Sequence, residues 1–301
     1  MKEEKSNQKD LLIDFSVLFY MRKSISGPQE KGFFMDGRKK LTISNLRKMK
    51  ETGEKIVMVT SYDACTASLA EMGNVDMILV GDSVGMTQLG YENTVQVTMD
   101  QMVHHCAAVR RGAPNTFIVG DMPFLSCQVS EEQAMRNAMR LMQEGSCDAI
   151  KIESDTFLAP LIAKMVHAGI PVMGHIGLLP QHIKTSGVYK IQGKSEKAAE
   201  RLLADAKALE AAGVFSMVIE CVPAVLAKRI TEEVSIPTIG IGAGKECSGQ
   251  VQVINDILGL SSYTPKHAKK YVSLAQVIRD TVSCYTKEVK EGVFPGEENT
   301  F

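Results

Sequence analysis

Residues 149–177 read AIKIESDTFLAPLIAKMVHAGIPVMGHIG and contain a complete strand, helix and strand unit. The short apolar run at the start predicts a buried strand, and the amphipathic stretch from about Asp155 to Gly169 predicts a helix. Pro171 stops that helix, and residues 172–174 predict the next strand. This order is typical of a βαβ unit, whose two strands lie parallel in one sheet.

The same alternation continues in both directions from this unit. A sheet that closes into a barrel needs about eight such strands, whereas an open dinucleotide-binding sheet carries a Gly-rich turn after its first strand. No such turn follows Thr60, so we predict an α/β fold of the TIM type, a closed (β/α)8 barrel. The expected strands are 56–60, 77–80, 117–120, 149–152, 172–174, 217–219, 238–241 and 251–254.

Helix boundaries support this reading. Thr98 and Ser130 each precede a Gln by three residues, a capping-box pattern that predicts a helix start. Three further helices are predicted to end at left-handed glycine caps near Gly145, Gly169 and Gly213. The connections between elements are therefore short and regular, as a barrel requires.

Length, charge and cysteine use restrict the function. The chain has 301 residues, with 34 Lys+Arg against 35 Asp+Glu, so one large domain that binds small molecules is expected and nucleic acid is not. Seven scattered cysteines without a Cys-x-x-Cys pair indicate a reducing cytoplasm. No apolar run approaches the roughly 20 residues of a membrane span, and no signal-peptide pattern is present.

The N-terminal part differs in composition from the rest. Residues 1–38 are expected to form a poorly ordered extension, and residues 39–301 a single catalytic barrel. One explanation of the extension is that the chain truly starts at Met35. The other is that the extension is a segment that docks on another subunit. In either case no motif residue lies in it.

Polar residues stand where the expected strands end. In a barrel the carboxyl ends of all strands meet at one mouth, which builds the active site. Lys151 and Glu153 are two residues apart, so their side chains point to the same side of the strand and Ile152 to the other. The residues predicted to share the mouth are Asp82, Ser83, Asp121, Lys151, Glu153, His175 and Glu220.

This acidic mouth predicts a magnesium site. Several carboxylates in a confined space repel one another unless a cation compensates them, and oxygen ligands favour Mg²⁺ over zinc. The pattern indicates metal-assisted chemistry beside a carbonyl, with Lys151 and the metal stabilising an oxyanion or a carboxylate. The alternative is that each acidic residue caps a helix or forms an ion pair, and that His175 is a hydrogen-bonded core residue.

A glycine cluster, Gly240-Ile241-Gly242-Ala243-Gly244, follows the seventh strand. In many barrels this place binds phosphate through backbone amides. The segment after the eighth strand, residues 255–257, lacks a second cluster, so close packing of backbones is the favoured interpretation and phosphate binding the alternative.

From about Lys40 to Phe301 the chain resembles the ketopantoate hydroxymethyltransferase family. The resemblance rests on many stretches rather than one motif. They are TSYD (60–63), VGDSVGM (80–86), RRGAP (110–114), DMPF (121–124), KIE (151–153), GHIGL (174–178), YKIQG (189–193), LEAAG (209–213), IGIGAG (239–244) and FPGEE (294–298).

The resemblance implies a barrel of the phosphoenolpyruvate/pyruvate type, assembled as a homodecamer. It implies hydroxymethyl transfer from 5,10-methylenetetrahydrofolate to 3-methyl-2-oxobutanoate, giving 2-dehydropantoate for pantothenate synthesis. Glu220 would be the general base, with His175 in the substrate pocket. Mg²⁺ would be held by Asp82, Asp121 and Glu153, and the oxo acid by Asp82, Ser83, Asp121 and Lys151.

Two positions depart from the family pattern, and two other functions stay open. Val188 stands where a second Gly is usual and Leu179 where Thr is common, which leaves the shape of the loop 181–194 open. One alternative function is a magnesium-dependent carbon–carbon lyase or phosphonomutase of oxo acids on the same barrel. The other is a non-catalytic oxo-acid binding protein, against which the intact Glu220 argues.

Overall fold

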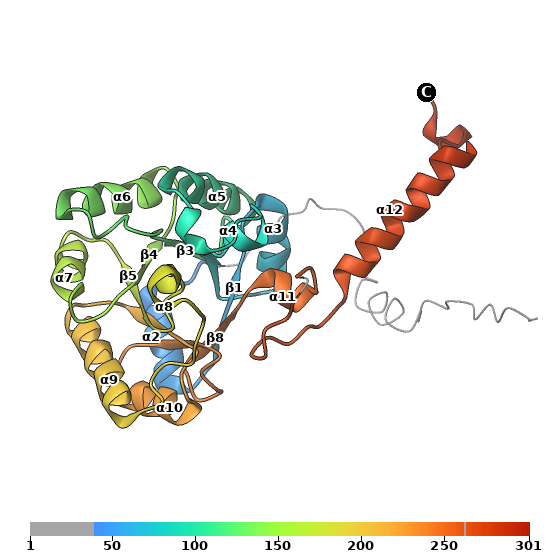
Figure 1. Cartoon of the computed structure of the whole chain (residues 1–301). Helices are drawn as coiled ribbons and strands as arrows, with labels where there is room; N and C mark the ends of the chain where they lie inside the picture. Colours follow the sequence, from blue (N-terminus) through green and yellow to red (C-terminus); the bar gives the residue numbers. More distant parts are fainter. Residues whose placement is uncertain (1–38, 262) are drawn as a thin grey trace, which may run out of the picture. The chain divides into compact units, whose positions relative to one another are not determined.

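The computed structural model describes residues 39–261 and 263–301 (Figure 1). The extension expected over residues 1–38, with Met35, lies outside the described residues.

Eight parallel strands close into a barrel in chain order, with β1 paired to β8. The predicted α/β barrel is therefore confirmed. The strands are β1 Ile56–Thr60, β2 Met77–Val80, β3 Phe117–Asp121, β4 Ala149–Glu153, β5 Val172–Gly177, β6 Ser216–Glu220, β7 Thr238–Ile241 and β8 Gly249–Gln252.

Helices surround the strands, except for the last one, α12, which extends away from the barrel (Figure 1). They are α2 Ile43–Thr52, α3 Ala64–Met72, α4 Val84–Thr87, α5 Met99–Gly112, α6 Glu131–Gln143, α7 Ala159–His167, α8 Ile183–Ser186, α9 Glu196–Ala211, α10 Ala224–Glu233, α11 Ile254–Leu258 and α12 Leu274–Glu291. Short 3-10 helices are η1 Thr94–Gln96, η2 Pro180–His182 and η3 Glu297–Asn299. Thr98 forms the predicted capping box of α5, and the Ser130 side chain accepts the Gln133 N–H at the start of α6.

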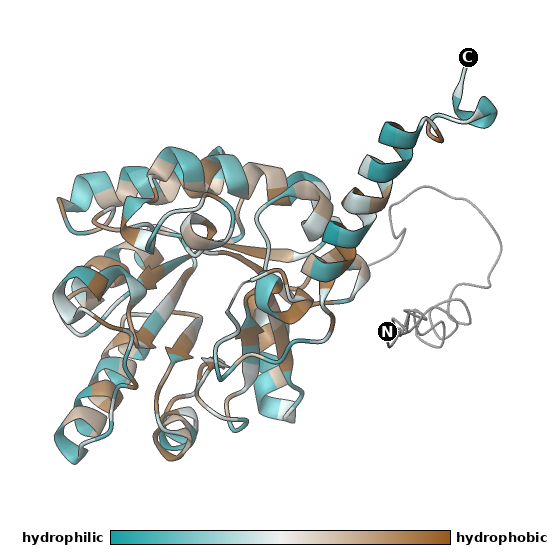
Figure 2. Cartoon of the chain, turned by 45° about the vertical axis from the view of Figure 1, so that its right-hand side comes forward, coloured by the Kyte–Doolittle hydropathy of each residue, from teal (hydrophilic) through white to brown (hydrophobic). Residues whose placement is uncertain are grey.

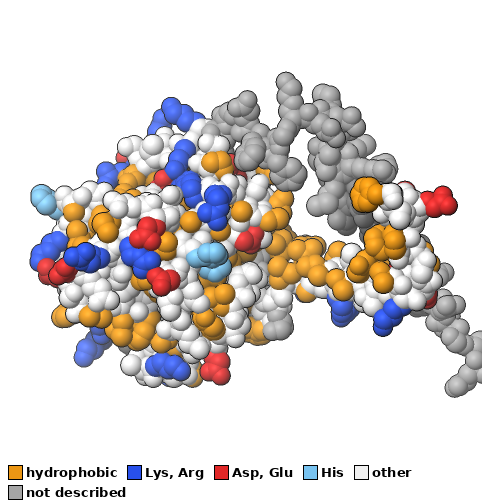
Figure 3. Space-filling view, turned by 90° about the horizontal axis from the view of Figure 1, so that it is seen from above, with side chains coloured by type: hydrophobic (Ala, Val, Ile, Leu, Met, Phe, Trp, Pro, Cys, Tyr) orange, Lys and Arg blue, Asp and Glu red, His pale blue; other side chains and the backbone are white. Residues whose placement is uncertain are grey.

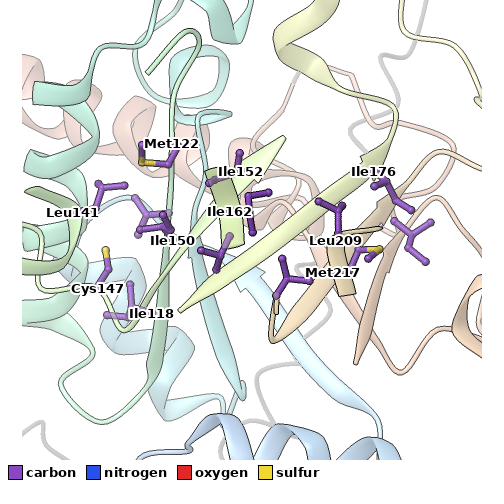
Figure 4. Packing of buried hydrophobic residues seen from close by; sticks show 14 of the residues in the cluster. Ile118, Met122, Leu141, Cys147, Ile150, Ile152, Ile162, Ile176, Leu209 and Met217 are labelled. Carbon is purple, nitrogen blue, oxygen red and sulfur yellow. The ribbon is translucent and has the colours of Figure 1, made fainter. Parts of the chain in front are cut away.

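The core has two layers, because successive strand residues point alternately into the barrel and out toward the helices. Outward residues such as Ile118, Ile150 and Ile152 pack against helix residues, among them Leu141 and Ile162 (Figure 4). Figure 2 shows this arrangement as apolar strands inside helices with hydrophilic outer faces. Inward residues form a second cluster to which α2 contributes Leu46 and Met49. That cluster fills the barrel interior below the mouth.

Several predicted boundaries were wrong, among them the end of β5 at Gly177 rather than 174, and three of the differences have a local cause. β8 begins at Gly249 rather than 251, because an added Cβ there would lie 2.3 Å from the Ile56 carbonyl oxygen and only glycine lets the strands approach. α7 begins at Ala159 rather than near Asp155, because Asp205 holds the Thr156 N–H and hydroxyl outside the helix.

The third concerns the end of α6. Gly213 and Gly169 have the predicted positive φ, but Gly145 does not, and the left-handed residue is Ser146 with φ 55°. The turn after this helix therefore comes one residue later than predicted.

The mixed charge of the surface agrees with the nearly balanced charge of the sequence, and the free cysteines agree with the absence of a Cys-x-x-Cys pair. Figure 3 shows lysine, arginine and acidic side chains interspersed on one face, without a large field of one sign. All seven cysteines are free. No helix in the described part of the chain is long and apolar enough to cross a membrane. α12 has no buried residue and exposes apolar side chains, among them Ile278, Val282 and Tyr285.

Candidate active site

All seven predicted site residues lie at the carboxyl ends of consecutive strands. Asp82 and Ser83 follow β2, Asp121 ends β3, Lys151 and Glu153 end β4, His175 lies in β5, and Glu220 ends β6. Strand pairing places Asp121 beside Lys151 and Glu153 beside His175. Ile150 and Ile152 pack in the outer layer, so Lys151 and Glu153 point inward as predicted.

A continuous line of contacts joins five of these residues. The Asp82 N–H donates to Asp121 Oδ2 at 3.1 Å, and Lys151 Nζ lies 2.9 Å from Asp121 Oδ1. The same ammonium lies 3.3 Å from His175 Nδ1. On the other side of the ring, His175 Nε2 lies 3.3 Å from Glu220 Oε2. The barrel therefore brings acid, cation, imidazole and a second acid together in one mouth.

Two buried atoms in this line lack a hydrogen bond within the described residues. They are Asp121 Oδ1 and His175 Nε2. Both have a charged neighbour at ion-pair distance, Lys151 and Glu220 respectively, but the angles do not meet hydrogen-bond geometry. Buried polar atoms without a partner are uncommon and mark places where a ligand can complete the geometry.

Burial and mutual repulsion perturb the ionisable groups. Burial and the neighbouring Asp121 raise the pKa of Asp82 to about 8. Burial and Asp82 raise the pKa of Glu153 well above its ordinary value. For Lys151 burial opposes the charge, but Asp121, Asp82 and Glu153 outweigh it and its pKa lies above the usual value. Without a further cation, the mouth therefore favours protonation of Asp82 and Glu153.

The two neighbours of His175 define its protonation. Burial, followed by the Lys151 charge, lowers the pKa of His175, so the ring is neutral at neutral pH. A charged ammonium can only donate, so Nδ1 accepts from Lys151 and the single ring proton lies on Nε2. The nitrogen that carries this proton lies 3.3 Å from Glu220 Oε2.

The backbone around Glu220 is tightly fixed. The Leu178 N–H donates to the Glu220 carbonyl at 2.8 Å, and the Cys221 N–H donates to the Ile241 carbonyl at 2.9 Å. Gly177 has φ 97°, and a Cβ there would lie 2.2 Å from the Glu220 carbonyl oxygen. Cys221 has φ 48°, an uncommon value for a residue with a side chain, which turns the chain directly after Glu220. The Glu220 side chain keeps 18% exposure, whereas Lys151 and Asp121 are nearly fully buried.

Two residues at the site were not predicted. Gln181 is buried and contacts both Asp82 and Glu153. Tyr62, which follows β1, shares a hydrogen bond of 2.8 Å with the Ser83 hydroxyl. Both lie in connections after strand ends, so the strand-end rule used for the other residues also points to them once connections are included.

The acidic mouth suits a divalent cation with few protein ligands. Among the described residues, no three His, Cys, Asp or Glu side chains converge closely enough to hold a metal ion among themselves. Mg²⁺ commonly takes one or two carboxylates and completes its shell with water and substrate oxygens. Asp82 and Asp121, joined through the Asp82 N–H and with Asp121 Oδ1 lacking a hydrogen bond, fit that pattern. The three-carboxylate set with Glu153 stays a prediction.

Sequence comparison places this site in a known family. Residues 40–297 match the family model described as ketopantoate hydroxymethyltransferase. The chain belongs to the ketopantoate hydroxymethyltransferase family. A 3-methyl-2-oxobutanoate hydroxymethyltransferase from Desulfotalea psychrophila is 53% identical over 86% of this chain and 94% of the relative. One of the same name from Ignicoccus hospitalis is 55% identical, over 86% of this chain and 98% of the relative.

Solved structures share the fold of this hydroxymethyltransferase family member at low identity. A 2,3-dimethylmalate lyase, described as a PEP mutase/isocitrate lyase superfamily member, has a TM-score of 0.54 at 15% identity, covering 86% of this chain and 91% of its own. A phosphonopyruvate hydrolase complex with oxalate and Mg²⁺ has a TM-score of 0.55 at 12% identity, covering 85% and 92%. These likenesses show that the barrel fold is shared.

The remaining family motifs can now be placed. In the glycine cluster, Gly242 and Gly244 have positive φ, and a Cβ on Gly244 would lie 2.6 Å from the Ala224 Cβ. Left-handed backbone and close side-chain neighbours account for these two glycines. The choice between close backbone packing and phosphate binding stays a prediction. Of the two departures from the family pattern, Leu179 precedes η2 and Val188 is exposed in the connection from β5 to α9.

Proposed function

We propose that this chain is a 3-methyl-2-oxobutanoate hydroxymethyltransferase that acts in pantothenate synthesis. The observation that supports it most directly is the buried line from Asp82 to Glu220 in a chain more than half identical to relatives of that name. The site offers what the reaction needs, which is an anion-binding region beside a base that reaches solvent.

The part of the line around Lys151 would receive the 2-oxo acid. The oxygens of the substrate carboxylate and ketone can accept hydrogen bonds from the Lys151 ammonium and the Ser83 hydroxyl. Asp82 and Asp121 would hold Mg²⁺ next to them, with Glu153 nearby. When bound, Mg²⁺ would supply Lewis-acid polarisation of the ketone and so acidify the adjacent C–H. Lys151 would then stabilise the negative charge that develops on oxygen.

Glu220 would act as the general base at C3. Its carboxylate lies at the end of the line, is partly exposed, and touches His175 Nε2 rather than the acidic pair. His175, neutral and with its proton on Nε2, would orient this carboxylate and stabilise its negative charge. The C3 proton passes to Glu220, and the electron pair becomes an enolate.

The enolate carbon would attack the methylene carbon of 5,10-methylenetetrahydrofolate. A new carbon–carbon bond forms, and both C–N bonds of the methylene carbon break. Water supplies the hydroxyl group of the hydroxymethyl product, and the C3 proton and the remaining water proton end on the two folate nitrogens. The products are 2-dehydropantoate and tetrahydrofolate. Folate is therefore a cosubstrate consumed in each turnover, and Mg²⁺ the resident ion.

Proton NMR of 3-methyl-2-oxobutanoate in D₂O tests this function. With enzyme and Mg²⁺ the C3 proton signal should disappear by exchange without folate, and adding 5,10-methylenetetrahydrofolate should give 2-dehydropantoate. Binding without exchange would indicate a non-catalytic oxo-acid binding protein. Turnover of a single 2-hydroxy acid or phosphonate without folate would indicate a lyase or phosphonomutase instead.

A homo-oligomer, with a decamer as the specific expectation, is also proposed. The apolar residues Ile278, Val282, Tyr285 and Val289 are exposed and recur at spacings of three and four along α12, so they share one helix face. Such a face is stable in water when a second copy covers it. Light scattering of the full chain measures the assembly directly.

A further inference from the structure

Gln181 lies at the centre of the acidic mouth although it belongs to a connection. It is the middle residue of η2 and only 4% exposed, whereas residues 184–191 after it are exposed. Its side-chain Nε2 donates to Asp82 Oδ2 at 2.9 Å and to the Met122 carbonyl at 3.0 Å. Its backbone N–H lies 3.2 Å from both Glu153 carboxylate oxygens. One residue thus reaches the ends of three neighbouring strands.

We propose that Gln181 is a positioning residue that sets Asp82 and Glu153 in the arrangement that receives a divalent cation, and that the same contacts close the connection from β5 to α9 over the mouth. The inference rests on the proposed function, since it concerns the ion that the proposed reaction uses.

The chemistry of an amide suits this task. Both partners of the Gln181 side chain, a carboxylate and a carbonyl, are acceptors, so the amide nitrogen uses both of its N–H groups. The Asp82 carboxylate is held through Oδ2, which leaves Oδ1 for another ligand. A Glu at this position would add a further negative charge to the mouth. A Lys would add an ammonium that competes with the cation.

The connection after Gln181 is tied to the site at both ends. At its start Gln181 contacts Asp82 and Glu153, and at its end the Gln192 N–H donates to the Cys221 carbonyl at 2.9 Å. Cys221 directly follows Glu220. Between these anchors, residues 184–191 contribute exposed side chains only. Loosening the Gln181 anchor should therefore free the connection and disturb Asp82 together.

The test compares Gln181→Met with Gln192→Met in the full chain. Gln181→Met keeps length and removes both side-chain donors. Gln192 lies in the same connection, but its side chain donates only to the Lys190 carbonyl, so its replacement is the matched control. Loss of a partner behind a metal ligand typically costs roughly 10- to 100-fold in metal affinity. We expect that loss for Gln181→Met in calorimetric titration with Mg²⁺ alone, and wild-type affinity for Gln192→Met.

Hydrogen exchange of the backbone amides 182–191 is the second readout. In Gln181→Met these amides should exchange faster than in the wild type and should not slow when Mg²⁺ is added. Raising Mg²⁺ should restore most of the C3 exchange rate, which it would not do for a protein that is merely misfolded. If Gln181→Met does not fold, Gln181→Asn replaces it, because the shorter amide cannot reach both Asp82 and Met122, and it too should bind Mg²⁺ more weakly.

Wild-type Mg²⁺ affinity in a folded Gln181 variant would overturn the inference, as would absence of Mg²⁺ binding by the wild-type protein. Failure of the proposed function is a separate result. It would appear as absence of C3 exchange by the wild-type enzyme with Mg²⁺ and 3-methyl-2-oxobutanoate, whatever the Gln181 variants bind.

Discussion

The imidazole of His175 and the carboxylate of Glu220 face each other across 3.3 Å, from Nε2 to Oε2. Lys151 on the far side of the ring makes Nδ1 an acceptor, so the proton lies on the nitrogen that faces Glu220. His175 therefore lies between Glu220 and the acidic pair that would hold the metal.

Glu220→Gln should abolish most proton transfer and leave binding intact. Glutamine keeps the size and can still contact His175, but it has no basic carboxylate. Loss of a general base costs about 10²- to 10⁴-fold in rate. C3 exchange in D₂O and product formation should fall together, with Glu232→Gln on α10 as the surface control. Exchange at wild-type speed with slow product formation would move Glu220 to the folate step.

Asp121→Asn should weaken Mg²⁺ binding and turnover together. A neutral amide is a poorer ligand for a hard cation, and the change also leaves Lys151 without its carboxylate partner. The loss should be at least the roughly 10- to 100-fold that outer partners of a metal site cost. Calorimetry of the folded variant measures it, and unchanged affinity would remove Asp121 from the metal ligands.

Without Mg²⁺ the protein should lose stability as pH rises. The folded pKa of Asp82 is about 8, above its ordinary value of about 4. A raised pKa means that the folded state binds the proton more tightly, so this contribution is complete below pH ~4 and lost by pH ~8. Thermal unfolding in a chelator should show Asp82→Asn gaining stability relative to the wild type between these values. Parallel curves for the two proteins would refute the assignment.

Gly177→Ala should destabilise the chain more than Gly169→Ala. Both glycines have φ near 90°, and an L-residue in the left-handed region costs about 1–2 kcal/mol. At Gly169 no atom lies within 4 Å of the added Cβ, whereas at Gly177 the Glu220 carbonyl oxygen lies at 2.2 Å. Chemical denaturation should show the larger loss for Gly177→Ala, together with slower C3 exchange. Equal losses of stability would mean that the backbone at Glu220 can shift away from the added Cβ without a cost in free energy.

Val282→Asp on α12 should dissociate the proposed homo-oligomer without unfolding the barrel. Val282 is 55% exposed and lies on the apolar face of the helix, so a charge there is costly only when a second copy covers it. Lys287→Asp places the same side chain on the opposite helix face and serves as control. Light scattering should report smaller particles for Val282→Asp alone, and an unchanged mass would exclude this face from the interface.

The barrel and most of the mouth could be predicted because they follow from local patterns. Strand alternation puts Lys151 and Glu153 on one side, and parallel strands bring their carboxyl ends together whatever the helices do. The order of strands and helices alone therefore placed Asp82 and Glu220 in one mouth, although they lie far apart in the sequence.

The remaining features depend on tertiary contacts that local patterns do not encode. A glutamine in a connection is ordinary, and nothing near Gln181 in the sequence shows that Asp82 will accept its amide. The start of β8 at Gly249 depends on Ile56 of the paired strand β1, which lies far away in the sequence.

The main-chain anchors of Glu220 have a consequence for redesign of this barrel. Two backbone hydrogen bonds hold the chain at this residue. The Leu178 N–H donates to the Glu220 carbonyl, and the Cys221 N–H donates to the Ile241 carbonyl. Peptide groups are the same whatever side chains the residues carry, so selection or engineering can vary the residues that line the mouth while the backbone at Glu220 stays in place. Substrate scope in this scaffold can therefore change by side-chain replacement, provided that position 177 stays glycine.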